Sequence, residues 1–213
     1  MGAISAVVPA FGNHEAYRSG LAKAWRLFGL PSVAPERGYT SFDWGGAHFV
    51  LLDSNHLDQA QRDWLAGDLA AAKQRHVRAI FGVCHDGPWS HGVHGGSRVM
   101  QTEFAPLLAA AGVDFIFGGH DHLYERGTGM TTNGPLPYVV TGGGGAPLYN
   151  PSCRVGHAGA DTNILPRCPS SVAAIAKAYH YVAVELGTRS LRLCAKLPDG
   201  SALEPCIETR LKR

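Results

Sequence analysis

The sequence predicts an α/β fold, and three of its features support that prediction. Short apolar runs alternate with amphipathic helical stripes over the first two thirds of the 213 residues. Three of these runs lead into a loop that carries a histidine. The last third holds further strand-like runs with few helical stripes between them. Since a chain of this length fits one domain with its own core, we expect residues 1–213 to form a single domain.

The expected elements are assigned from hydrophobic periodicity in chain order. Helices are expected, from apolar residues spaced three and four apart, at about 16–28, 57–74 and 100–111. Strands are expected, from apolar runs bounded by turn residues, at 6–11, 39–44, 48–53, 78–84, 113–117, 138–141, 179–185, 191–196 and 205–211. Gly45-Gly46 separates the second and third strands, which predicts a hairpin.

Composition is that of an ordinary globular protein, with 45% hydrophobic and 17% charged residues. The formal net charge of +2 gives no reason to expect nucleic-acid or membrane-surface binding. No run of about 18 apolar residues occurs, so no membrane-spanning helix is expected. The N-terminal segment lacks a basic start and an obvious cleavage site, so we do not expect a signal peptide there.

The five cysteines fall into two local pairs and one single residue. Cys153 and Cys168 lie in a Gly/Pro-rich loop at about 142–171, and Cys194 and Cys206 flank a turn near the C-terminus. This placement favours two disulfides and a secreted or periplasmic origin. Five reduced cysteines in a cytosolic protein is the alternative. Cys84 lies in an apolar strand and is expected to be a buried free thiol.

Three apolar runs are each followed closely by candidate ligand side chains, which are Asn13, His14, His85, His120 and His122. In open α/β sheets the loops at the carboxyl ends of the strands converge, so these side chains are expected to meet. Imidazole nitrogens and an amide oxygen suit zinc, iron or manganese. One such histidine is more often a surface or packing residue, but three strand ends that each carry one favour a metal site.

The order of these strings carries a resemblance to a known family. GNHE at 12–15, a histidine at the end of the next core strand, and GHDH at 119–122 resemble the last three sequence blocks of the calcineurin-like metallophosphoesterases. The surrounding strings at 39–44, 48–54, 64–69 and 124–126 are similar to the purple acid phosphatase branch. The similarity runs from about Val8 to Glu185. It implies a metallophosphoesterase-type two-sheet sandwich flanked by helices.

The resemblance also implies roles. Asn13, His85 and His120 would hold the second metal of a binuclear centre, and His122 the first. His14 would lie beside the scissile phosphate and stabilise charge or protonate the leaving group. The metals would be divalent or trivalent Fe, Zn or Mn, and a metal-activated hydroxide would attack phosphorus.

The implied activity is hydrolysis of a small phosphate ester, with a phosphomonoester as the expected substrate. His91 and His94 lie in the Gly-rich loop after His85, where one of them would contact phosphate; a mobile surface loop is the alternative. A phosphodiesterase or nucleotidase on the same scaffold is a second hypothesis for the activity. A non-catalytic remnant that binds at most one metal is a third.

The first two sequence blocks of the family, Asp-x-His and Gly-Asp, are not found before Asn13, so the N-terminal strands are expected to be missing. We expect weak binding of one metal or none, and a possible homodimer through the exposed sheet edge. The nearest candidate replacement carboxylates are Asp53, Asp86 and Asp121. Asp86 and Asp121 adjoin expected ligands, and such immediate neighbours are expected to point away from them. Asp68 of the Gly67-Asp68 pair is expected on a solvated helix surface.

Several remaining side chains are assigned no part in the site. His180 alternates with apolar residues and is expected to be packed. No partner is evident for the other histidines, which are His48, His56, His76 and His157. Trp25, Trp44 and Trp64 are expected in the core, and Trp89 is a candidate wall of the substrate pocket.

Overall fold

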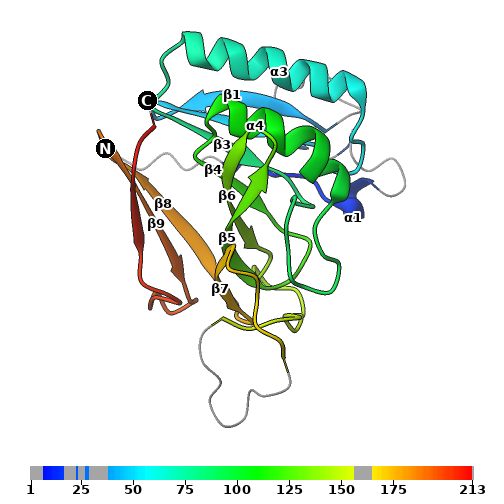
Figure 1. Ribbon diagram of the computed structural model, residues 1–213, viewed down its shortest axis with the longest axis vertical. Coiled ribbons are helices and arrows are strands. Elements are labelled where there is room, and N and C mark those ends of the chain that lie inside the picture. Colours follow the sequence, from blue (N-terminus) through cyan, green and yellow to red (C-terminus); the bar gives the residue numbers. More distant parts are fainter. Residues whose placement is uncertain (1–6, 17–22, 24–26, 29–37, 156–164, 213) are drawn as a thin grey trace.

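The computed structural model describes residues 7–16, 23, 27–28, 38–155 and 165–212 (Figure 1). Most of the helix expected at 16–28 lies outside the described residues, as do Trp25 and His157. Within the described part, the helical elements are α1 Asn13–Ala16, α3 Gln59–Gln74, the π-helical η2 Met100–Phe104 and α4 Ala105–Ala111. None of the helices in these residues is long and apolar enough to cross a membrane.

Two sheets make up the β structure. The larger has the order β1-β2-β3-β4-β6-β5-β7 and the smaller has the order β10-β9-β8. The strands are β1 Thr40–Trp44, β2 Ala47–Leu51, β3 Ala79–Val83, β4 Phe115–Gly118, β5 Tyr124–Thr131, β6 Gly134–Thr141, β7 Val172–Ala176, β8 Tyr181–Leu186, β9 Ser190–Lys196 and β10 Ile207–Arg210. β2, β3, β4 and β6 run parallel, as expected for an α/β fold.

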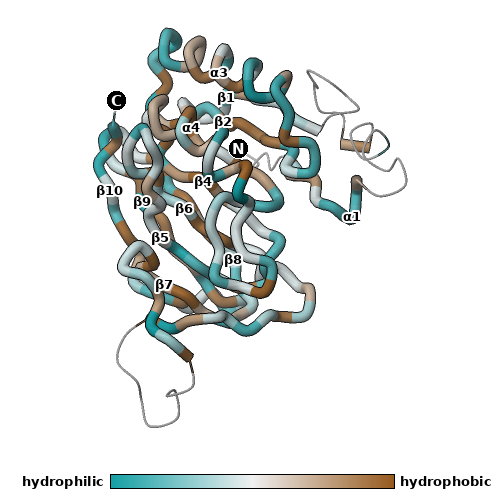
Figure 2. Tube along the Cα trace, turned by 45° about the vertical axis from the view of Figure 1, so that its right-hand side comes forward, coloured by the Kyte–Doolittle hydropathy of each residue, from teal (hydrophilic) through white to brown (hydrophobic). Residues whose placement is uncertain are grey.

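The larger sheet has an apolar layer on each face, because successive side chains of a strand point to opposite faces. Ile80 and Ile116 pack with α3 and α4, whereas Phe81 and Phe115 pack toward β9. In Figure 1 the helices accordingly lie over one face and the smaller sheet beyond the other. Figure 2 shows hydrophobic and hydrophilic turns alternating along α3, as a half-covered helix requires. The two-sheet sandwich flanked by helices is thus confirmed.

The hairpin prediction is confirmed. β1 and β2 pair antiparallel with Trp44 opposite Ala47, and Gly45 and Gly46 have φ of 60° and 85°. Two consecutive positive φ values are those of a two-residue hairpin turn, which glycine adopts without strain. Trp44, expected in the core, is 58% exposed because it occupies the end of an edge strand.

Three strand assignments were wrong. Residues 7–12 form no strand in the described structure, since they pair with no neighbouring strand there. β5 was missed because its sequence, YERGTGMT, contains two glycines and no apolar run. β7 was missed because VAAIA is rich in alanine, which is depleted in strands.

Both predicted disulfides are present, and Cys84 is buried and free. Cys153–Cys168 closes the long loop, and Cys194–Cys206 ties β9 to the segment before β10. Disulfides of this kind form in oxidising compartments. The alternative of five reduced cysteines is therefore wrong.

Helix α3 offers a stability test at its C-terminal end. His76 follows the helix with φ of 54°, a left-handed conformation in which a side chain costs about 1–2 kcal/mol. We expect His76→Gly to raise the free energy of unfolding by about 1 kcal/mol, measured by urea denaturation. His76→Ala keeps the Cβ atom and is expected to match the wild type. Equal stability of the two variants would show that the backbone is not strained.

Candidate functional site

The centre of the site lies where β3 and β4 end. These strands are parallel neighbours, and His85 and His120 each lie two residues beyond the end of their strand. Gly119 N donates to His85 O at 2.7 Å, which joins the two loops. His85 Nε2 lies 3.0 Å from His120 Nδ1, so the two rings present these nitrogens to each other. The predicted convergence of these two histidines is present.

The His120 backbone is left-handed, with φ of 62°. A non-glycine residue held in this region costs about 1–3 kcal/mol and persists only where its surroundings enforce it. Asp121 N donates to Gly119 O at 2.7 Å, and Leu123 N donates to Asp121 O at 2.8 Å. These short-range bonds fix a tight turn that directs the His120 ring toward His85.

Asn13 is the first residue of α1 and follows directly after Gly12. The loop before it contacts the His85 ring, because a Cβ atom on Gly12 would lie only 2.7 Å from His85 Nδ1. Only glycine permits this approach. Asn13 Oδ1 is buried and has no hydrogen-bond partner. A buried amide oxygen without a donor is costly, and a cation would satisfy it.

The donors at this point fit one metal ion. Burial is the main cause that lowers the pKa of His85 to about 4, with a further contribution from His120. Burial also lowers the pKa of His120. A lowered pKa favours the neutral ring, whose unprotonated nitrogen can offer a lone pair to a cation. His85 Nε2 and His120 Nδ1 lie 3.0 Å apart, which is close enough for both to reach one ion.

Carboxylates do not complete this set. In the described ranges, no group of three or more His, Cys, Asp or Glu side chains converges closely enough to hold a metal. The set consists instead of two imidazoles and the amide of Asn13, so the charge of a bound cation would not be offset by these three ligands.

His122 lies beside this set rather than in it. Its Nδ1 is 2.8 Å from Pro147 O, and its ring stacks on Tyr149 with the centroids 4.3 Å apart. His14 is exposed on α1, and its charge when protonated lowers the pKa of both His85 and His120. Both side chains therefore lie near the candidate ligands His85 and His120, whose pKa values His122 also lowers.

The two loop histidines differ in their surroundings. The His94 ring packs on the His120 ring at 4.1 Å between centroids, so His94 lies at the site. His91 is held by Glu125, which accepts from the His91 backbone N at 2.7 Å and pairs with its Nδ1 at 2.9 Å. These contacts tie both histidines to neighbouring elements in the structure.

Asp121 also holds the loop that carries His91 and His94. Its carboxylate accepts from Ser90 Oγ at 2.5 Å, from His94 N at 2.9 Å and from Gly95 N at 3.2 Å. It is 1% exposed and its oxygens are occupied by the loop. Asp121 thus points away from the metal ligands, as expected.

The other two candidate carboxylates have their own environments. Asp53 accepts from Asn55 N at 2.9 Å and pairs with His56 Nδ1 at 2.9 Å, so it also points away. Burial is the main cause that raises the pKa of Asp86 to about 6, and the neighbouring Asp121 adds to it. Asp86 N donates to Ser54 Oγ at 2.9 Å, which ties this residue to the loop after β2.

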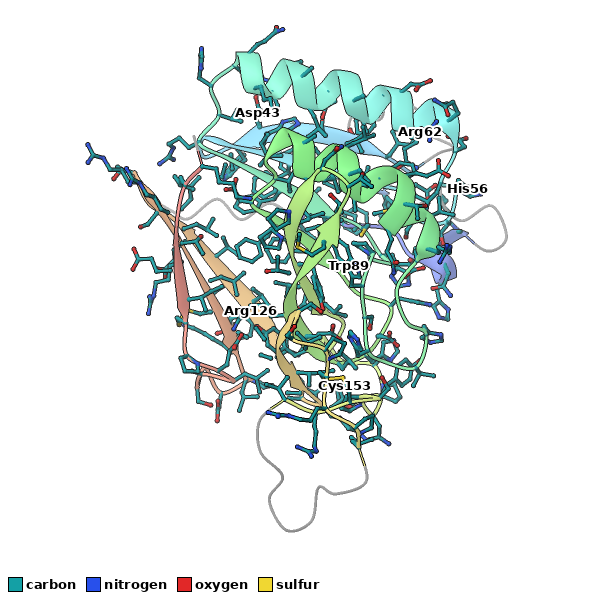
Figure 3. The ribbon with its side chains drawn as sticks, viewed as in Figure 1. Asp43, His56, Arg62, Trp89, Arg126 and Cys153 are labelled. Carbon is teal, nitrogen blue, oxygen red and sulfur yellow. A yellow bond between two sulfur atoms is a disulfide. The ribbon has the colours of Figure 1, made fainter. Side chains whose placement is uncertain are left out.

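Three aromatic expectations can now be settled. His180 is packed as predicted, 5% exposed and edge-on to Tyr124. Trp64 is half-buried against Tyr39 and the core, with ring centroids 4.8 Å apart. Trp89, a candidate pocket wall, instead packs on Tyr138 at 5.4 Å in the core beneath the loop (Figure 3).

Sequence reasoning missed Tyr149 and the anchoring role of Glu125. Tyr149 lies in an irregular loop without periodicity, and no local signal marks it. Glu125 was noted only within the YER string. Its position directly after the His120–His122 turn, on a strand otherwise facing the core, is the signal that points to a buried anchor.

Comparisons with known proteins identify the family of this chain. Residues 2–124 match the calcineurin-like phosphoesterase family. Purple acid phosphatase 21 of Arabidopsis thaliana is 31% identical over 146 residues, covering 62% of this chain and 32% of the plant protein. Tartrate-resistant acid phosphatase type 5 of Rattus norvegicus is 35% identical over 96 residues, covering 45% and 27% of the two chains.

A solved structure shares the fold. Purple acid phosphatase PPD1 from yellow lupin (Lupinus luteus) seeds superposes with a TM-score of 0.77 at 18% identity, over 94% of this chain and 37% of the lupin chain. The chain spans about a third of the length of the plant relatives that it matches. Since the family match covers more than half of the 213 residues, the chain belongs to the calcineurin-like phosphoesterase family, and its relatives include purple acid phosphatases.

Proposed function

We propose that the protein is a metal-dependent phosphoric-ester hydrolase that acts on phosphate monoesters. The observation that carries this proposal is the 3.0 Å approach of His85 Nε2 and His120 Nδ1 in a chain of this family. Asn13, whose Oδ1 is buried without a hydrogen-bond partner, follows directly after the Gly12 that contacts the His85 ring. These three atoms would hold one ion, and His122 would contribute to a neighbouring one. When bound, Fe, Zn or Mn supplies a Lewis acid and lowers the pKa of a coordinated water.

The chain's own residues would handle the ester. His14 is exposed beside the ligands, so its imidazolium can donate a proton to the leaving oxygen. His94 packs on His120 and would donate a hydrogen bond to a phosphate oxygen. Asp121 positions the loop that carries His94 through the His94 backbone N. Nucleic acid and membrane are not proposed as partners, and the disulfides support a secreted or periplasmic location.

Metal content is the first test. The wild-type chain, dialysed against Zn²⁺ and analysed for bound metal, is expected to hold about one ion, because the described ligands form one set. His120→Ala is expected to lower Zn²⁺ affinity by more than about 100-fold, beyond the 10–100-fold typical of an outer-shell change. His76→Ala removes an exposed histidine far from these ligands and serves as the matched control.

Three outcomes bear on the proposal. A wild-type chain without bound Zn²⁺, Mn²⁺ or Fe would favour the non-catalytic alternative, which the lack of a carboxylate among the three ligands also supports. Two ions lost together in His120→Ala would show that further ligands come from elsewhere in this chain or from a second copy. Hydrolysis of bis-p-nitrophenyl phosphate in preference to p-nitrophenyl phosphate would favour a phosphodiesterase.

A further inference from the structure

The segment from Pro147 to Cys153 contacts His122 in three ways. Pro147 O lies 2.8 Å from His122 Nδ1. Tyr149 N donates to His122 O at 2.9 Å. The Tyr149 ring stacks on the His122 ring with an interplanar angle of 13°. One short stretch of loop therefore holds both the backbone and the ring of this histidine.

The Pro147 contact selects a tautomer. A carbonyl oxygen only accepts hydrogen bonds, so His122 Nδ1 must carry the proton that lies between them. In the neutral ring Nε2 then has no proton and retains its lone pair. Fixing one ring nitrogen through a backbone carbonyl is how proteins orient a histidine for a metal.

The Tyr149 contact restricts the orientation of that ring. With the two planes nearly parallel and the centroids 4.3 Å apart, rotation of the imidazole about its χ2 angle would drive its edge into the phenol. The same phenol also meets the His94 ring edge-on at 5.5 Å. Tyr149 therefore links His122 to the loop that packs on His120.

The segment is itself anchored on the side away from His122. Ser152 donates to His91 O from its N at 2.7 Å and from its Oγ at 2.9 Å. The next residue, Cys153, is 4% exposed and bonded to Cys168. Figure 3 shows Cys153 at the end of the molecule remote from Asp43 and α3. These anchors keep the Tyr149 ring against His122.

We propose that Tyr149 is a positioning residue for His122. Its ring, held by the stapled segment, keeps the His122 ring in the orientation in which Nδ1 donates to Pro147 O, and this hydrogen bond fixes the Nδ1–H tautomer, so that Nε2 is presented to a metal ion. This inference rests on the proposed function, because the role of His122 as a metal ligand is part of that proposal. The fixed ring itself is a property of the metal-free chain.

The test compares Tyr149→Phe, which keeps the stacked ring, with Tyr149→Ala, which removes it. Tyr181→Ala removes a tyrosine that is 47% exposed elsewhere and is the matched control. Long-range ¹⁵N–¹H NMR spectra of the metal-free protein at about pH 8, where imidazoles are neutral, report the tautomer. The His122 signals are assigned by their absence in His122→Asn. A Co²⁺ titration gives the metal affinity.

Wild type, Tyr149→Phe and Tyr181→Ala are expected to show the Nδ1–H tautomer and a ring shift at His122 from the stacked neighbour. Tyr149→Ala is expected to lose the ring shift, to move toward the Nε2–H tautomer, and to bind Co²⁺ about 10–100-fold more weakly. An unchanged His122 tautomer in Tyr149→Ala overturns the inference, and so does a Tyr149→Phe variant that behaves like Tyr149→Ala.

The two readouts separate this inference from the proposed function. If the wild-type chain binds no Co²⁺ while the tautomer responds to Tyr149→Ala, positioning stands and the metal-dependent function fails. If Co²⁺ binds tightly in every variant while the tautomer never changes, the function stands and positioning fails.

Discussion

Replacing His48 with alanine is expected to lower the free energy of unfolding by about 3 kcal/mol near pH 5. His48 is 1% exposed and lies between two carboxylates. Its Nδ1 is 2.6 Å from Asp43 Oδ1, and its Nε2 is 2.8 Å from Asp68 Oδ2. Removing the ring leaves both carboxylates without this donor, and Asp68 is only 14% exposed.

The geometry requires a charged ring. Ionised carboxylates only accept hydrogen bonds, so both nitrogens of His48 must donate, which makes the ring an imidazolium. Burial by itself would lower the pKa of His48, but the hydrogen bonds to Asp68 and Asp43 outweigh burial and raise it. Burial likewise favours the neutral acid at Asp43, yet hydrogen bonds from Arg75 and His48 lower its pKa.

The two shifts set the pH range of the effect. A raised histidine pKa stabilises the fold fully below its ordinary value of 6.5, and this stability is lost as the pH rises through the folded-state value. A lowered Asp43 pKa stabilises the fold above its ordinary value of 3.8, and this stability is lost as the pH falls through the lowered value. The difference between wild type and His48→Ala is therefore largest between these two ordinary values and shrinks in alkaline solution.

Guanidinium unfolding of both proteins at about pH 5 and about pH 9 checks this expectation. His56→Ala is the control, because His56 is 52% exposed and pairs with Asp53 alone, so its loss should cost less than about 1 kcal/mol. A His48→Ala deficit that is the same at both pH values would mean that the ring is neutral in the folded protein.

The same cluster shows what the sequence could and could not predict. His48 was expected to have no partner, and that was wrong. The Asp43 partner follows from the hairpin, since a two-residue turn at Gly45-Gly46 places Asp43 opposite His48. Asp68 was expected on a solvated helix surface, also wrongly. Its contact depends on how α3 packs across β1 and β2, which no local pattern specifies.

The approach of the two candidate ligands His85 and His120 was predictable for the opposite reason. His85 and His120 follow buried parallel strands, and the ends of adjacent parallel strands must meet. Tyr149 reaches the site through an irregular loop whose path depends on a disulfide and on hydrogen bonds to His91 O. Hydrophobic periodicity was therefore sufficient to predict that His85 and His120 lie together. The position of Tyr149 beside them could be seen only in the folded structure.

Replacing Glu125 with leucine is expected to lower the free energy of unfolding by about 3–5 kcal/mol. Glu125 is fully buried, and its carboxylate accepts from Tyr138 Oη at 2.6 Å. It also binds His91 through the backbone N at 2.7 Å and through Nδ1 at 2.9 Å. Leucine would leave the Tyr138 hydroxyl and the His91 backbone N without their acceptor. Glu125→Gln, which keeps the shape and one acceptor oxygen, is expected to cost less.

The loop after β3 has two separate anchors, and this separation makes the effect local. Glu125 holds it at His91, whereas Asp121 holds it at His94 and Gly95. In Glu125→Gln we therefore expect the His91 amide to exchange with deuterium faster while the His94 amide keeps its protection. Zn²⁺ affinity should change little, because Glu125 holds the loop at His91, whereas the His94 that packs on His120 is held by Asp121. Equal loss of protection at both amides would show that the loop opens as one unit. In that case Glu125, as well as Asp121, would be needed to position His94 beside His120.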